Sequence, residues 1–190
     1  MNATRSSDKR ALTRTIDGVE LPAAGLWNVP AGRATVTLAM PRVLDRVIGA
    51  RIRLRQGTIA IADNPANSTA QFTLEVAGRA SVPVRVTRIE HRRGSMWTAV
   101  GWMTIDDVAT PLDFSITYAG VHPRWPAALF RADVTLPLRH LVGGDGGWRA
   151  RLLGNGAVRA AIEIHAVPMR PSASVRSLAA AGAVSGRRAS

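Results

Sequence analysis

The sequence predicts an all-β protein built from antiparallel strands. Residues 112–118 read LDFSITY, and such a strict alternation of apolar and polar residues is typical of a strand with one buried face. The same period of two recurs along most of the chain, turn residues separate the alternating segments, and no segment has a convincing helical period. A β-sandwich and a closed antiparallel barrel fit this pattern equally, because both bury one face of every strand.

Turn signals divide residues 25–167 into about eight or nine strands. Residues 63–65, 92–94 and 106–107 have turn composition, and the Asn-Gly pair at 155–156 is typical of a two-residue hairpin. Each segment between these turns places its apolar residues on one face. The expected strands span residues 35–40, 51–55, 71–76, 82–89, 101–105, 112–118, 128–138 and 158–164.

The composition fits one folded domain. The chain has 190 residues, of which 46% are hydrophobic, and this is enough apolar surface to offset the chain entropy. No apolar run approaches the roughly 18 residues of a membrane-spanning helix, and residues 1–15 lack the apolar core of a secretory signal. We therefore expect a cytoplasmic protein. The chain has no cysteine, which excludes disulfides, thiolate metal sites and thiol nucleophiles.

Three regions are expected along the chain. Residues 1–21 are polar and form a flexible N-terminal segment, residues 22–168 form the β domain, and residues 169–190 form a basic, disordered tail. The net charge of +12 favours binding to an anionic membrane surface, an acidic protein or nucleic acid, and charge alone does not distinguish among these partners. Nucleic acid is not the expected partner, because no nucleic-acid-binding motif accompanies the charge.

No catalytic constellation is present in the sequence. The four histidines, His91, His122, His140 and His165, show no metal-ligand spacing, and we expect them at surface positions. No serine lies in a GxSxG motif, and no glycine-rich phosphate loop leads into a helix. We therefore expect no enzymatic activity, no cofactor and no metal.

A basic stripe lies on one face of residues 51–55. Alternation places Arg51, Arg53 and Arg55 opposite two apolar residues, with about 7 Å between successive side chains. The stripe is either a solvated sheet face or a contact for an anionic surface such as lipid headgroups. Trp102 falls on the outward parity of its strand, so we expect it to be exposed, where it either packs on Arg side chains or anchors at an interface.

Four motifs follow one another in order along the chain: GLWNVPAGRATVTLAM at 25–40, Gly49, GWMTIDDVATPLDF at 101–114 and LLGNGAVRAAIEIHAV at 152–167. In this order and spacing they resemble the YceI-like family of lipocalin-like, lipid-binding barrels. The resemblance implies a single antiparallel lipocalin-like β-barrel of about eight strands. It also implies a non-enzymatic carrier for an apolar, lipid-like ligand such as a polyisoprenoid, a quinone or another long-chain lipid.

The residues expected to line such a barrel occupy the inward parity of the strands. An eight-stranded barrel is either filled by its own side chains or holds one small ligand, so core packing is the alternative role of each residue. The candidate lining residues are Leu38, Met40, Ile52, Leu54, Phe72, Leu74, Val84, Val86, Met103, Ile105, Phe114, Ile116, Phe130 and Val134.

An interaction module is the alternative function. In that case the barrel is solidly packed, and the Arg-rich face or the tail docks on an acidic protein or an anionic membrane surface. The chain also lacks the family's central segment, because residues 76–78 lead almost directly into the strand at 82–89. The interior is then either more open or filled, and a strand edge left unpaired at this point would allow a homodimer.

Overall fold

The computed structural model describes residues 12–39, 52–76, 79–138 and 156–169, and they form an all-β fold, as predicted. No helix in these ranges is long and apolar enough to cross a membrane. The elements are β1 (Thr13–Ile16), β2 (Val19–Pro22), β3 (Gly25–Val29), β4 (Ala34–Ala39), β5 (Ile52–Ile61), the 3₁₀ turn η1 (Pro65–Asn67), β6 (Thr69–Val76), β7 (Arg79–Arg93), β8 (Met96–Ile105), β9 (Val108–Val121), β10 (Ala128–Pro137) and β11 (Ala157–Pro168).

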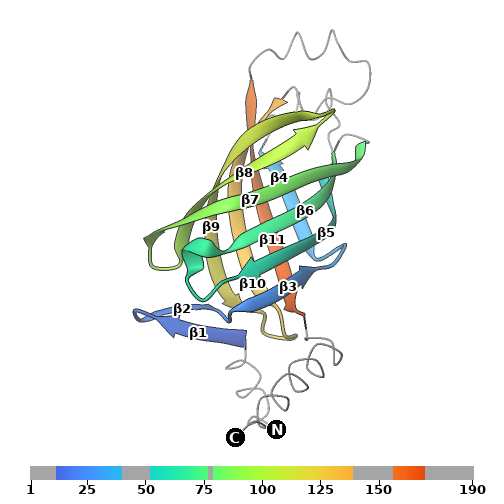
Figure 1. The fold of residues 1–190 in the computed structure, drawn as a ribbon. Coiled ribbons are helices and arrows are strands. Elements are labelled where there is room, and N and C mark those ends of the chain that lie inside the picture. The colour runs from blue at the N-terminus through green and yellow to red at the C-terminus, as the bar shows by residue number, and fades with distance from the viewer. Residues whose placement is uncertain (1–11, 40–51, 77–78, 139–155, 170–190) are drawn as a thin grey trace, which may run out of the picture.

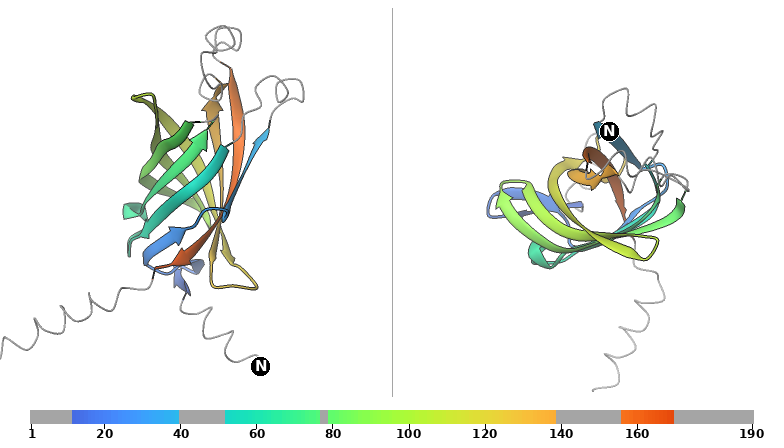
Figure 2. Two further views of the ribbon diagram at one scale, coloured as in Figure 1. Left: turned by 90° about the vertical axis from the view of Figure 1, so that its right-hand side faces the viewer. Right: turned by 90° about the horizontal axis from the view of Figure 1, so that it is seen from above.

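Eight of the strands close into an antiparallel barrel. Hydrogen bonds connect them in the order β10, β9, β8, β7, β6, β5, β3 and β11, and β11 pairs back with β10. Figure 1 shows the barrel from the side, and the right-hand view of Figure 2 shows the strands forming a ring. Because the sheet closes on itself, the fold is a barrel and not a sandwich. The inward-facing residues of every strand therefore surround one interior.

The barrel wall has a seam between β4 and β5. β3 and β4 follow one another along the same edge of β11, but only β3 also pairs with β5. Among the described strands, none pairs with the other edge of β4, and β4 diverges from β5 in the left-hand view of Figure 2.

The shortened middle of the chain leaves no open edge, contrary to expectation. β6 pairs directly with β7 from Val76 opposite Arg79 onward, so the two strands leave no unpaired edge between them. Among the strands that the structure describes, the unpaired edge lies at the seam instead, where β4 pairs with β11 and not with β5.

A hairpin occupies part of the N-terminal segment that was expected to be flexible. β1 and β2 pair with each other through a two-residue turn, Asp17-Gly18, whose residues both have positive φ. Asp-Gly is well suited to this turn, because Gly accepts positive φ without strain and Asp tolerates it. Leu12 and Leu21 are buried, so the hairpin packs against one end of the barrel (Figure 1). The two strands are too short for alternation to predict them.

Single-residue bulges change which face of a strand points inward. The pairing register shifts at Arg55 in β5 and at Thr87 in β7. A bulge adds one residue to one strand, so the alternation reverses beyond it. Arg53 and Arg55 therefore point outward as predicted, whereas Gly57 and the residues that follow it alternate in the opposite phase.

Candidate ligand cavity

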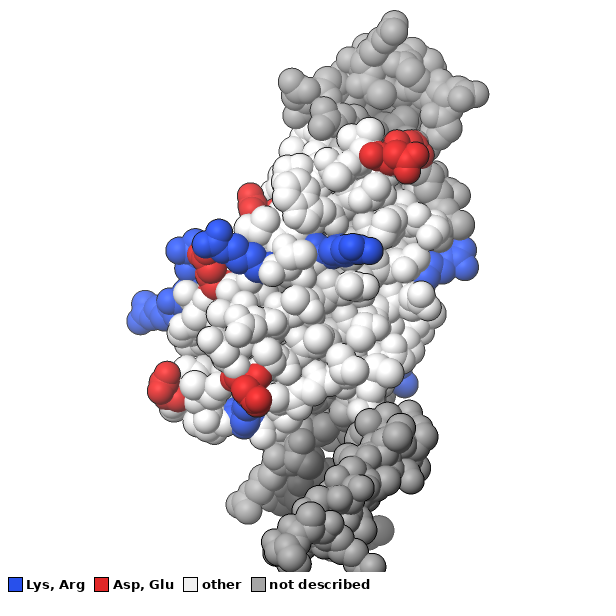
Figure 3. Space-filling view, viewed as in Figure 1, with Lys and Arg blue, Asp and Glu red and all other residues white. Residues whose placement is uncertain are grey.

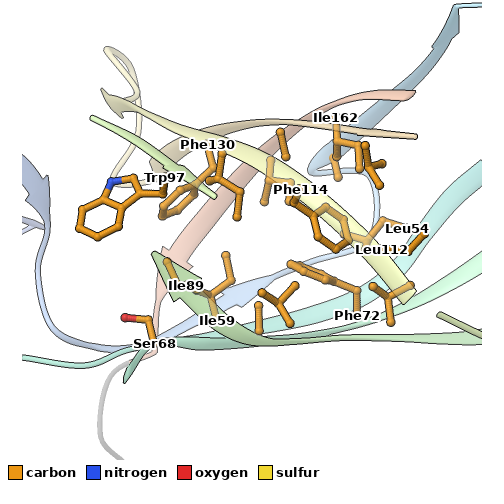
Figure 4. Close-up of a pocket in the computed structure, with 18 of the residues that line it drawn as sticks. Leu54, Ile59, Ser68, Phe72, Ile89, Trp97, Leu112, Phe114, Phe130 and Ile162 are labelled. Carbon is orange, nitrogen blue, oxygen red and sulfur yellow. The ribbon is translucent and has the colours of Figure 1, made fainter. Parts of the chain in front are cut away.

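An apolar cavity lies inside the barrel. Its volume is about 160 Å³, close to the roughly 150 Å³ of an engineered apolar cavity that holds benzene. Phe72 of β6, Phe114 of β9 and Phe130 of β10 line it from different strands, together with aliphatic side chains (Figure 4). The wall is almost wholly carbon, so the cavity offers an apolar molecule burial and few hydrogen-bond partners.

Most residues that alternation placed inside the barrel line this cavity. Ile105 is buried but lies off the cavity wall, and Leu38 packs against the core without reaching it. Met40 lies outside the described residues. The candidate residues on the wall are Ile52, Leu54, Phe72, Leu74, Val84, Val86, Met103, Phe114, Ile116, Phe130 and Val134.

Further wall residues were not among the candidates. Leu112 and Tyr118 share the inward face of β9 with Phe114, so the alternation did carry a signal for them. Ile59 and Ile89 follow the bulges in β5 and β7. No local signal identifies them, because the position of a bulge depends on the partner strand.

Polar side chains reach the wall at the end of the cavity that the β1–β2 hairpin covers. Arg14 donates from Nη2 to the carbonyl of Ala62, and the Ala62 amide donates to Oγ of Ser68 at 3.1 Å. Both side chains line the cavity, and Figure 4 shows Ser68 at the opposite end from Leu54. Tyr118 also lines the cavity; its hydroxyl and the Arg14 Nε are buried and have no hydrogen-bond partner.

The basic stripe and Trp102 lie apart on the outer surface. Arg55 forms an ion pair with Glu75 of β6 at 2.8 Å, Arg53 is exposed, and Arg51 lies outside the described residues. Trp102 is 45% exposed, as its parity predicts, but β6 and β7 separate its strand from β5. Figure 3 shows basic side chains across the middle of one face of the barrel, among mostly uncharged neighbours. The structure therefore does not bring the stripe and Trp102 together.

Two histidines form a cluster of rings at the end of the barrel. His122 stacks on Trp125 with 3.7 Å between ring centroids, and Arg33 lies over the same Trp ring. His165 lies 5.3 Å from His122, between ring centroids, and contacts Glu163 at 3.2 Å. Partial desolvation and the nearby cationic or titratable groups, chiefly His165, lower the pKa of His122.

The described residues contain no group of three or more His, Asp or Glu side chains that would hold a metal ion. No protein-family model matches the chain, and no curated protein is significantly similar to it.

Proposed function

We propose that this protein is a non-enzymatic binding or carrier protein for a small apolar molecule, or for the hydrocarbon end of a longer lipid. The observation that carries the proposal is the carbon-lined cavity inside the closed barrel. Each methylene group that leaves water for such a cavity contributes about 0.8 kcal/mol to binding. A cavity with few polar atoms selects for apolar surface and places little restriction on chemical detail.

The size of the cavity sets the size of the bound group. A volume of about 160 Å³ accommodates a group about as large as benzene, which is comparable to a five-carbon isoprene unit. The resemblance to YceI-like proteins supports an isoprenoid or quinone-type lipid as the source of this group. In that case one end of the lipid fills the cavity, and the rest of the chain extends beyond it.

Two neighbouring alanines of β11 provide the test. Ala160 is fully buried and lines the cavity, whereas Ala161 is exposed on the outer face. Ala160→Leu fills part of the cavity and should weaken the binding of toluene at least tenfold in isothermal titration calorimetry. Ala161→Leu adds the same atoms on the outside and should leave toluene binding unchanged. If Ala160→Leu does not fold, Ala132→Leu on β10 tests the same wall.

Extraction of the purified protein gives an independent measurement. Mass spectrometry of an organic-solvent extract should recover an apolar molecule in stoichiometric amount from the wild type and less of it from Ala160→Leu. If toluene does not bind and repeated extractions recover no apolar molecule, the proposed function is wrong.

A further inference from the structure

Two residues that line the cavity carry buried hydrogen-bond donors that lack acceptors. Tyr118 is only 5% exposed, and its hydroxyl is buried with no partner. The Nε of Arg14 is also buried with no partner, although the two Nη atoms of the same guanidinium contact Ala62 and Asp63. A buried donor without an acceptor carries a desolvation cost, and such groups are rare in folded proteins.

Both donors belong to the same end of the barrel. Arg14 of β1 pairs with Leu21 of β2, and β2 packs against β9, which carries Tyr118. The carboxylate of Glu20 on β2 is close enough to act electrostatically on the Tyr118 hydroxyl. Arg14 therefore lies with Ser68 at the end of the cavity that the hairpin covers, and the hairpin packs on the strand that carries Tyr118.

We infer that the cavity takes an apolar ligand carrying a neutral oxygen acceptor, such as a carbonyl group, and that Tyr118 and Arg14 donate to this oxygen. This inference rests on the proposed function and specifies its ligand. An Arg Nε can only donate. Both donor atoms are shielded from solvent, so water does not supply the missing acceptor, and an oxygen of the bound ligand would.

The protonation state of Tyr118 agrees with a donor role. Burial, and secondarily the charge of Glu20, raise the pKa of the Tyr118 phenol well above its usual range. The hydroxyl consequently keeps its proton at neutral pH.

Nearby charges favour a neutral acceptor over a carboxylate. Asp63 lies 3.5 Å from Nη1 of Arg14 and already faces its positive charge, and Glu20 adds a second negative charge near Tyr118. A ligand carboxylate would lose its hydration in the carbon-lined cavity, and this loss together with repulsion from Glu20 opposes its binding. A carbonyl oxygen accepts the same hydrogen bonds without that repulsion.

Three aromatic probes of similar size test the inference with the full chain. Acetophenone has a carbonyl group, α-methylstyrene has a methylene group in place of the oxygen, and benzoate has a carboxylate. Isothermal titration calorimetry should show that Tyr118→Phe weakens acetophenone about tenfold, the factor for one buried hydrogen bond of about 1.4 kcal/mol, and leaves α-methylstyrene unchanged. Benzoate should bind at least tenfold more weakly than acetophenone to the wild type.

A second variant separates the hydroxyl from general packing. Val134→Ala on β10 removes wall carbon atoms and should weaken acetophenone and α-methylstyrene by similar factors. If both probes bind and Tyr118→Phe leaves their affinity ratio unchanged, the inference is wrong and the proposed function stands. Equal or tighter binding of benzoate would overturn the preference for a neutral oxygen. If none of the probes binds, the proposed function fails and the inference fails with it.

Discussion

Two glycines show how closely the backbone and the rings of the barrel wall are packed. A Cβ at Gly101 would lie 2.4 Å from the carbonyl oxygen of Arg85 on the neighbouring strand. A Cβ at Gly57 would lie 2.3 Å from Cδ1 of Phe72, whose ring packs over that position. Both glycines are buried within strands, and in each case the reason is close approach of another group. The difference is that Gly101 meets backbone, whereas Gly57 meets a side chain that can rotate.

This difference predicts unequal costs for two similar substitutions. Gly101→Ala should lower the free energy of unfolding by about 1–3 kcal/mol, the usual range for overpacking, because the Arg85 carbonyl cannot move without disturbing the β7–β8 pairing. Gly57→Ala should cost less, because the Phe72 ring can shift toward the cavity.

Urea denaturation measures the loss of stability in both variants, and titration with toluene measures the effect of moving the Phe72 ring. Gly57→Ala should weaken toluene binding, since the displaced ring of Phe72 takes up cavity volume. Equal stability losses in the two variants, with unchanged toluene binding in Gly57→Ala, would contradict this account.

At the scale of elements, the loop between β9 and β10 is held by its rings. The His122 amide donates to the carbonyl of Ala127 at 2.8 Å, and the Ala127 amide donates to the carbonyl of Trp125 at 2.8 Å. The His122 ring stacks on Trp125 at an interplanar angle of 4°, and the amide of Arg124 donates to its Nδ1 at 3.2 Å. Since Nδ1 accepts this bond, the stacked arrangement requires an imidazole that is unprotonated at that atom.

The loop therefore makes stability depend on pH. The pKa of His122 is lowered in the folded state, so between that value and the unfolded value of about 6.5 the unfolded chain binds more protons. Stability is fully retained above about pH 6.5 and is lost as the pH falls toward the folded pKa. His165, Arg124, Arg33 and Glu163 set this environment.

The measurement compares urea denaturation at pH 8 and pH 5. The wild type should lose more stability on acidification than His122→Gln, which cannot take up the proton. His91→Gln removes a histidine that packs on Trp97 and not on Trp125, and it should reduce the loss of stability on acidification less than His122→Gln does. An identical loss in His122→Gln and the wild type would contradict the assignment to His122.

For the whole molecule, the hydrogen bonding between neighbouring strands of the barrel is interrupted at the seam between β4 and β5. β11 pairs with β10 along one edge and with β3 and β4 along the other, whereas the described strands leave one edge of β4 without a partner. In an antiparallel pair only alternate residues of a strand direct their amides to a given neighbour. Hydrogen bonds thus close the barrel where β3 pairs with both β11 and β5, whereas the described residues of β4 pair with β11 alone.

Amide hydrogen exchange should report this asymmetry. Across Ala34–Ala39, slow and fast amides should alternate in NMR-detected exchange, because only those directed at β11 have a strand partner. Residues 114–117 of β9 pair on both sides, so all their amides should exchange slowly. Uniformly slow exchange throughout β4 would contradict an unpaired edge and would indicate that another strand, such as that of a second copy, covers it.

Much of the fold and part of the cavity could be predicted from the sequence. Local alternation identified the inward faces of β6, β8 and β10, because their side-chain period depends only on the strand itself. The hairpin turn at Asp106-Asp107 was also predicted from the sequence. Both residues have positive φ, a conformation that Asp tolerates better than most residues. Ile59 and Ile89 could not be predicted, because a bulge upstream reverses their faces.

The sequence by itself determined that the chain forms antiparallel strands with one apolar face, since this property belongs to each segment separately. Only the tertiary structure decided that β11 pairs with β3 as well as with β10 and so closes a barrel, because β3 and β11 lie at opposite ends of the strand order along the chain. The polar end of the cavity was likewise decided by the tertiary structure and not by the sequence alone. Arg14 and Tyr118 are more than 100 residues apart in the sequence, and it is the packing of the β1–β2 hairpin on the barrel that places both donors on one wall.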